Sequence, residues 1–161
     1  MSPSPSYAEG TLVPVQRTIN ELDALLARFG AGGFIYGRDE EQGISAVAFK
    51  LNGRQVRFTV ALPSSADYMR SPTGRPRSPS SAAQVADAEL RRRWRVKVML
   101  VKALLVAVAE GGLSMDEAFL PHVVLAGGRT VAEWATPQLN GGAAELGPLL
   151  PGWLPAGALD G

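Results

Sequence analysis

Few side chains in this sequence of 161 residues are suited to catalysis. There is no cysteine, which excludes disulfides, thiolate metal sites and cysteine nucleophiles. His122 is the only histidine, and it follows Pro121 in an apolar segment, which is typical of a packed residue rather than a general base. Acidic residues gather at 39–41 and 116–117 and could hold a hard cation, but a loop and a first helical turn also favour structural acids. We therefore expect that this protein is not an enzyme and that it holds neither a metal ion nor a cofactor.

Basic residues form the other chemically distinct group. Residues 64–102 hold nine basic and three acidic residues, a net charge of +6, whereas residues 103–161 hold one basic and six acidic, a net charge of −5. Within the basic segment, residues 90–106 predict a helix whose first half is cationic and whose second half is apolar. Such a helix can bind a phosphate backbone. It is equally typical of a solvated helix end whose long side chains cover the edge of a core.

The candidate phosphate-binding residues come from this helix, from the Arg-rich loop before it and from the polar face of a predicted hairpin. At about 100° per residue, Arg91, Arg95 and Lys102 fall on one side of the helix. Two tyrosines are candidates for stacking on unpaired bases, although for the one on a strand the alternative is a place in the core. The phosphate-binding candidates are Lys50, Arg57, Arg70, Arg75, Arg77, Arg91, Arg92, Arg95 and Lys97, and the stacking candidates are Tyr36 and Tyr68.

The hairpin is predicted by Asn52-Gly53, which lies between two apolar-alternating segments, residues 44–51 and 54–62. Asn-Gly is favoured in two-residue turns because both positions need a positive φ. A two-residue turn pairs Leu51 with Arg54, and this register places the large apolar side chains of both strands on one face. That face must belong to the core, and the polar face can meet solvent or a ligand. A further strand is predicted at residues 34–38.

Helix starts are predicted by capping boxes, in which a Ser or Thr hydroxyl and a Glu three residues later satisfy the free amides of a first turn. We expect the first of these helices to end at Gly30 and the last to stop near Pro137. The long basic helix is predicted from about 82 to 110. The three capping pairs are Thr18 with Glu21, Ser114 with Glu117 and Thr130 with Glu133.

The element order α-β-β-β-α-α-α predicts one α+β domain, a three-stranded antiparallel meander with helices packed on one face. We place this domain at residues 12–139, with a disordered arm at 1–11, a mobile basic loop at 63–81 and a Gly/Pro/Leu-rich tail at 140–161. The first residues lack the basic start and apolar run of a signal peptide. No apolar run approaches the roughly 20 residues that span a bilayer. We expect a cytoplasmic protein that does not associate with membranes.

Seven segments of the chain carry a resemblance to known proteins: VPVQRT (13–18), ARFGA (27–31), FIYG (34–37), GRQVRF (53–58), RRWR (92–95), FLPHVVL (119–125) and GRTVAEW (128–134). Over about residues 12–139 the chain resembles a family of small uncharacterised phage and prophage proteins. This resemblance implies a phage-related role in a bacterial host. The order of helix, meander and long basic helix is also similar to Red-beta-type single-strand annealing proteins. That similarity implies a homo-oligomer that holds DNA along the hairpin and the basic helix.

These observations predict a non-enzymatic, phage-type nucleic-acid-binding protein that binds and anneals single-stranded DNA as a homo-oligomer. The alternative is a phage protein–protein interaction module that inhibits or modulates a host enzyme or defence complex. The acidic C-terminal part and the apolar tail with Trp153 favour that alternative.

Overall fold

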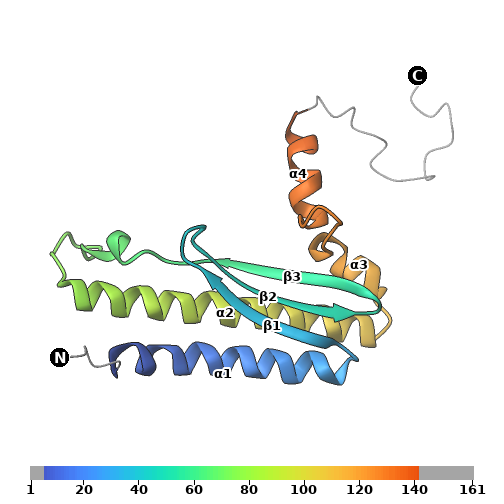
Figure 1. The fold of residues 1–161 in the computed structure, drawn as a ribbon, viewed down its shortest axis with the longest axis horizontal. Helices are drawn as coiled ribbons and strands as arrows, with labels where there is room; N and C mark the ends of the chain where they lie inside the picture. Colours follow the sequence, from blue (N-terminus) through green and yellow to red (C-terminus); the bar gives the residue numbers. More distant parts are fainter. Residues whose placement is uncertain (1–5, 142–161) are drawn as a thin grey trace, which may run out of the picture.

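The fold is a small sheet covered on one face by two long helices. The structure, a computed structural model, describes residues 6–141 of the chain. The predicted α+β class and the order α-β-β-β-α-α-α are confirmed. Two 3-10 turns, η1 (Ser65–Tyr68) and η2 (Leu120–His122), lie within the connections. The main elements are α1 (Ser6–Arg28), β1 (Gly32–Asp39), β2 (Ile44–Leu51), β3 (Arg54–Ala61), α2 (Pro79–Ala109), α3 (Met115–Phe119) and α4 (Val131–Gly141) (Figure 1).

The sheet is an antiparallel meander in the order β1-β2-β3, with the predicted hairpin register. Leu51 pairs with Arg54 across a turn in which Asn52 and Gly53 have φ values of 50° and 74°. Positive φ at both central residues is the geometry that a type I′ turn requires, and Asn and Gly adopt it at low cost. The turn thereby sets which face of the hairpin is apolar.

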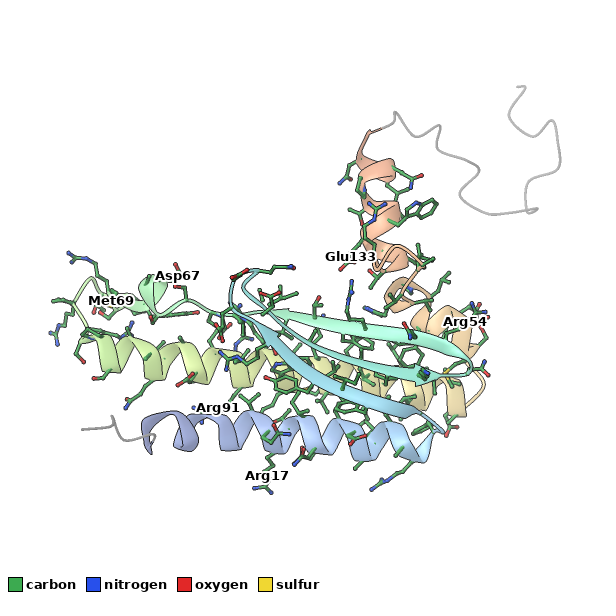
Figure 2. The ribbon with its side chains drawn as sticks, viewed as in Figure 1. Arg17, Arg54, Asp67, Met69, Arg91 and Glu133 are labelled. Carbon is green, nitrogen blue, oxygen red and sulfur yellow. The ribbon has the colours of Figure 1, made fainter. Side chains whose placement is uncertain are left out.

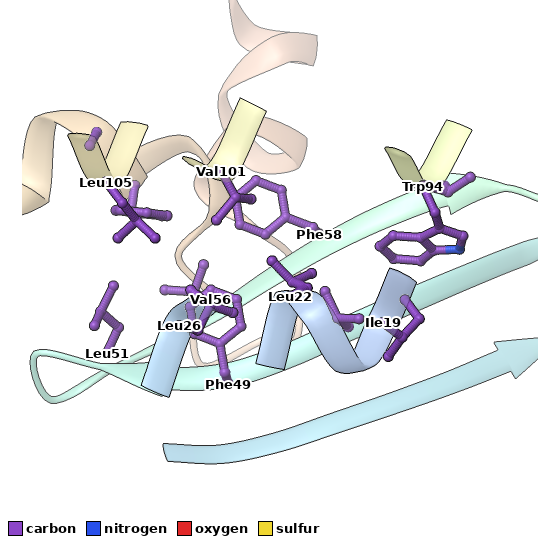
Figure 3. Close-up of a cluster of buried hydrophobic side chains, with 14 of the residues drawn as sticks. Ile19, Leu22, Leu26, Phe49, Leu51, Val56, Phe58, Trp94, Val101 and Leu105 are labelled. Carbon is purple, nitrogen blue, oxygen red and sulfur yellow. The ribbon is translucent and has the colours of Figure 1, made fainter. Parts of the chain in front are cut away.

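The core lies between the apolar face of the sheet and helices α1 and α2, which run side by side beneath it (Figure 1). Trp94 of α2 is fully buried, and its indole Nε1 donates a hydrogen bond to Ser45 Oγ at 3.1 Å. Phe49 and Phe58 stack with their ring centres 6.2 Å apart. The largest fully buried side chains are Ile19, Leu22 and Leu26 of α1, Val47, Phe49, Val56 and Phe58 of the hairpin, and Trp94, Val101 and Leu105 of α2 (Figure 3).

Helix α1 begins well before its predicted start. It runs from Ser6, so Thr18 lies inside the helix and is buried, and the predicted capping box at this position is wrong. Val15 is also buried and continues the inward row of Ile19 and Leu22 toward the N-terminus. Packing against α2 therefore extends the helix past a local start signal. Residues 6–11, which we expected in a disordered arm, belong to this helix.

The loop between β3 and α2 contains regular hydrogen bonding, although we expected it to be mobile. After η1, Arg70 and Pro76 form an isolated antiparallel bridge, and Arg77 N donates to Met69 O at 2.7 Å. Helix α2 begins at Pro79, with Ser78 as its N-cap, close to the predicted start. Proline suits this position because the first amides of a helix have no intrahelical partner.

The two C-terminal capping boxes are confirmed. Ser114 caps α3 and Thr130 caps α4, each through reciprocal bonds with a glutamate three residues on. Helix α4 continues through Pro137 to Gly141 and projects away from the sheet (Figure 1), so the prediction that it stops near Pro137 is wrong. Among the described residues no helix is long and apolar enough to cross a membrane. Residues 142–161, including Trp153, lie outside the described part of the chain.

Candidate nucleic-acid interface

The structure divides the nine predicted phosphate-binding residues among three places. Lys50 and Arg57 lie on the hairpin face that points away from the core, three arginines lie in the loop after β3, and four cations lie on α2. Because α2 packs against the opposite face of the sheet, the hairpin cations and the helix cations face different directions. They do not form one continuous surface.

Arg57 is used to hold the C-terminal segment on the sheet. Its Nη1 donates to Gly128 O at 2.8 Å and its Nη2 to the Glu133 carboxylate at 2.7 Å. The pKa of Glu133 lies below its ordinary value, first because Thr130 N donates to the carboxylate and then because of the Arg57 charge. Arg57 thus has a structural role, and a phosphate at this residue would compete with Glu133 and the Gly128 carbonyl for the guanidinium.

Two of the three loop arginines donate hydrogen bonds to backbone carbonyl groups of the loop. Arg77 Nη1 donates to Arg70 O at 2.9 Å and to Tyr68 O at 3.2 Å, and Arg70 Nη1 donates to Gly74 O at 3.2 Å. These bonds satisfy carbonyl groups that a compact loop would otherwise leave to water. The side chain of Arg75 is exposed and has no hydrogen-bond or ion-pair partner among the described residues. Arg75 is therefore the one loop arginine free for a ligand in this part of the chain.

Glu89 neutralises part of the basic segment of α2. It accepts two hydrogen bonds of 2.8 Å from Arg92 and one of 2.9 Å from Arg93. These bonds lower the pKa of Glu89 from 4.5 to about 2. Arg93 also donates to Ala61 O at the end of β3 (2.8 Å). The spacing of three and four residues from Glu89 is visible in the sequence and is the known geometry of helical ion pairs.

A row of unpaired cations follows one side of α2. Among the side chains that the structure describes, those of residues 15–141, Arg91, Arg95 and Lys102 have no hydrogen-bond or ion-pair partner, and the last two are exposed. Figure 2 shows Arg91 on the side of α2 that faces α1. With a rise of 1.5 Å per residue, the row places charges about 6 Å and then about 10 Å apart along the axis. We call these three residues the α2 cationic row.

An open groove of about 520 Å³ lies on the opposite side of α2, against the end of β3. Lys97 lines it, together with Arg92, Arg93 and Thr59. Lys97 also contributes to the lowered pKa of His122, for which burial is the larger cause. The groove is cationic on its helix side, although Arg92 and Arg93 share the single negative charge of Glu89.

Lys50 stands apart from all of these residues. It pairs with Gln55, next to the Asn52-Gly53 turn. The turn and the loop after β3 lie at opposite ends of the long axis of the molecule (Figure 1). The structure therefore does not bring Lys50 together with the loop arginines.

The two predicted stacking residues are both partly buried within the fold. Tyr36 packs edge-on against Trp94 with ring centres 6.0 Å apart, and its hydroxyl accepts a hydrogen bond from Ser45. The core alternative for Tyr36 is therefore the one the structure favours, because the partly buried ring packs against the core cluster. Tyr68 lies half-buried in η1, which packs on α2.

The groups that could have indicated catalysis have structural roles. His122 is half-buried and stacks on Phe58 with ring centres 4.1 Å apart, as expected of a packed histidine. Asp116 pairs with Arg54 at 2.9 Å, and Asp39 caps its own loop by accepting from Gln42 N. No group of three or more metal-binding side chains occurs in the described region.

Comparisons of this chain with protein-family models, with curated proteins and with solved structures find no match. The candidate site therefore rests on the geometry of this structure, which is that of the α2 cationic row.

Proposed function

We propose that this protein binds single-stranded nucleic acid through its phosphates, without catalysing a reaction on it, along the α2 cationic row. The observation that supports the proposal is a difference in pairing. Arg92 and Arg93 share Glu89, whereas Arg91, Arg95 and Lys102 have no partner among the side chains of residues 15–141. A rigid helix that keeps unpaired cations in register loses little entropy when it binds a polyanion.

A single strand suits this row better than a duplex. Reading a major groove requires a helix that can enter a slot about 12 Å wide. Helix α2 is held between α1 and the sheet and cannot enter one without carrying both along. A flexible single strand can instead lie along the exposed flank of the helix. Because both candidate tyrosines are partly buried, we expect little base stacking, and we expect electrostatic contacts to supply most of the affinity.

The alternative, a module that binds and modulates a host protein, is supported by a different surface. On α4, Trp134 and Leu139 are 47% and 70% exposed, in a helix that projects away from the sheet (Figure 1). Exposed large apolar side chains on a projecting helix are available for contacts with another protein. Binding to a stoichiometric protein partner in nuclease-treated host lysate, together with no affinity for nucleic acid, would favour this alternative.

The test is fluorescence anisotropy of a labelled single-stranded oligonucleotide over a range of salt concentrations. The variant Arg91→Gln/Arg95→Gln removes two charges from the row and keeps good helix formers. We expect at least tenfold weaker binding at low salt. We also expect the slope of log K against log salt to become shallower by about 1.4, since each single-strand phosphate contact contributes about 0.7.

The matched control is Lys50→Gln/Arg129→Gln, which removes two exposed charges elsewhere on the molecule. It should bind as the unmodified protein does. The proposal is wrong if the unmodified protein shows no affinity at low salt, or if both double variants lose affinity equally. If binding follows the row, annealing of complementary strands is the next activity to measure.

A further inference from the structure

The outward face of α2 carries a second apolar row. Val96, Met99, Leu100 and Val106 are 52%, 70%, 41% and 49% exposed. None of the described elements covers them, whereas Trp94, Val101 and Leu105 of the same helix are completely buried. A helix with an apolar row on both sides normally buries both. The outward row therefore lacks its partner in the described chain.

The spacing of the outward row is that of a coiled-coil seam. Its positions are separated by four, three, four, three and four residues, the alternation that keeps side chains on one seam between two helices. The seam begins and ends with opposite charges and has apolar residues between them. In order, its residues are Arg92, Val96, Met99, Ala103, Val106 and Glu110.

We infer that this seam is the interface of a homodimer in which the α2 helices of two copies pack antiparallel. A twofold axis beside Val101 relates the six positions in pairs. It sets Val96 of one copy against Val106 of the other and sets Met99 against Ala103. The large side chain thus meets the small one, which is how knobs fill holes in such packing. The same surface serves both copies, as a twofold interface requires.

Charge complementarity favours a second copy in this orientation. The same axis sets Arg92 against Glu110 twice. Glu110 is exposed and has no ion-pair partner among the described residues. Arg92 keeps 66% of its side chain exposed although it bonds to Glu89. A parallel copy in register would instead set Arg92 against Arg92 and Glu110 against Glu110, which is repulsive. Antiparallel packing also places opposite helix dipole ends together.

The experiment measures the mass of the full chain by light scattering or sedimentation over a wide concentration range. We expect a concentration-dependent dimer. Ala103→Glu places a charge at the centre of the seam and should give a monomer at every concentration. The matched control Ala24→Glu makes the same change at an exposed site near the C-terminal end of α1 and should dimerise normally. Circular dichroism and thermal unfolding check that each variant is folded.

Charge reversal tests the orientation. Arg92→Glu and Glu110→Arg should each weaken the dimer at least tenfold, and the double variant should restore it, since the reversed pair attracts again. An unmodified chain that is always monomeric, or a dimer that Ala103→Glu leaves intact, overturns the interface. A dimer disrupted by Ala103→Glu but not restored by the double reversal overturns the antiparallel register. A monomer in which Met99 resists oxidation would indicate that residues 142–161 cover the seam, and this too overturns the proposal.

Discussion

Helix α2 has two apolar faces of similar composition, of which one is buried and the other is exposed. The inward face, with Trp94, Val101 and Leu105, is completely buried against the sheet and α1. The outward face, with Met99 and Val106, is largely exposed. The comparison shows that apolar periodicity in a helix predicts that a face is buried. It does not identify the element against which that face packs. Which face joins the core depends on complementary side chains in distant parts of the chain, such as the bond from Trp94 to Ser45.

A matched pair of leucines tests this difference most strongly. Leu105→Ala removes a completely buried side chain from the inward face and should lower the free energy of unfolding by about 3 kcal/mol, through lost burial and the cavity left behind. Leu100→Ala makes the same change on the outward face, where the side chain is 41% exposed, and should cost less than about 1 kcal/mol. Urea denaturation of both variants measures the difference. Equal losses would show that the two faces are equally packed in solution.

The polar contact at the inward face gives a second test. Ser45→Ala removes the acceptor of the Trp94 indole N–H in a buried site and should destabilise the fold by about 2 kcal/mol, because the donor is left unsatisfied. In a Trp94→Phe background the same change should cost clearly less, since no donor is then stranded. Urea denaturation of the four proteins gives this coupling. Purely additive effects would contradict it.

An isosteric pair isolates polarity from volume. Val101→Thr buries a hydroxyl on the inward face and should cost about 1 to 2 kcal/mol of unfolding free energy. Val106→Thr places the same hydroxyl on the outward face, where Val106 is 49% exposed, and should change the stability of the monomer at high dilution by no more than about 0.5 kcal/mol. Thermal and urea unfolding report both values. A large effect of Val106→Thr on the monomer would contradict its exposure.

The smallest expected effect is a pH dependence from His122, which lies on the inward-facing Phe58. Burial, with the charge of Lys97, lowers the pKa of His122 below its ordinary 6.5. The unfolded chain therefore binds this proton more readily, so its contribution to stability is complete above pH 6.5 and declines as the pH falls below it. Glu89 does not interfere, because its contribution declines only between about pH 4.5 and 2. Urea denaturation between pH 7.5 and 5.5 should show the decline, and His122→Phe should reduce it.

The local parts of the fold were predictable from sequence. The Asn52-Gly53 turn needs positive φ at both positions, so it defined the hairpin register and with it the apolar face of the sheet. The capping pairs at Ser114 and Thr130 have all their partners within three residues, and both were found where predicted. The same local pattern at Thr18 was wrong, because packing along α2 continues α1 past it.

The candidate site was only half predictable. The sequence placed nine cations as candidates, and the row of Arg91, Arg95 and Lys102 on one side of a helix follows from helical periodicity alone. The pairing of Arg92 with Glu89 could also be predicted from helical periodicity, because residues three apart are neighbours on the surface of a helix. The pairing of Arg57 with Glu133 was not, because the partners are 76 residues apart.

By itself, the sequence determined the element types, the hairpin register, two of the helix caps and the division of charge between the basic centre and the acidic C-terminal part. These depend on interactions within a few residues. Only the tertiary structure decided which arginines are free, which tyrosine packs against the core and which face of α2 is left open. Those outcomes depend on contacts between segments far apart in the chain, and spacing along a sequence contains no distance between such segments.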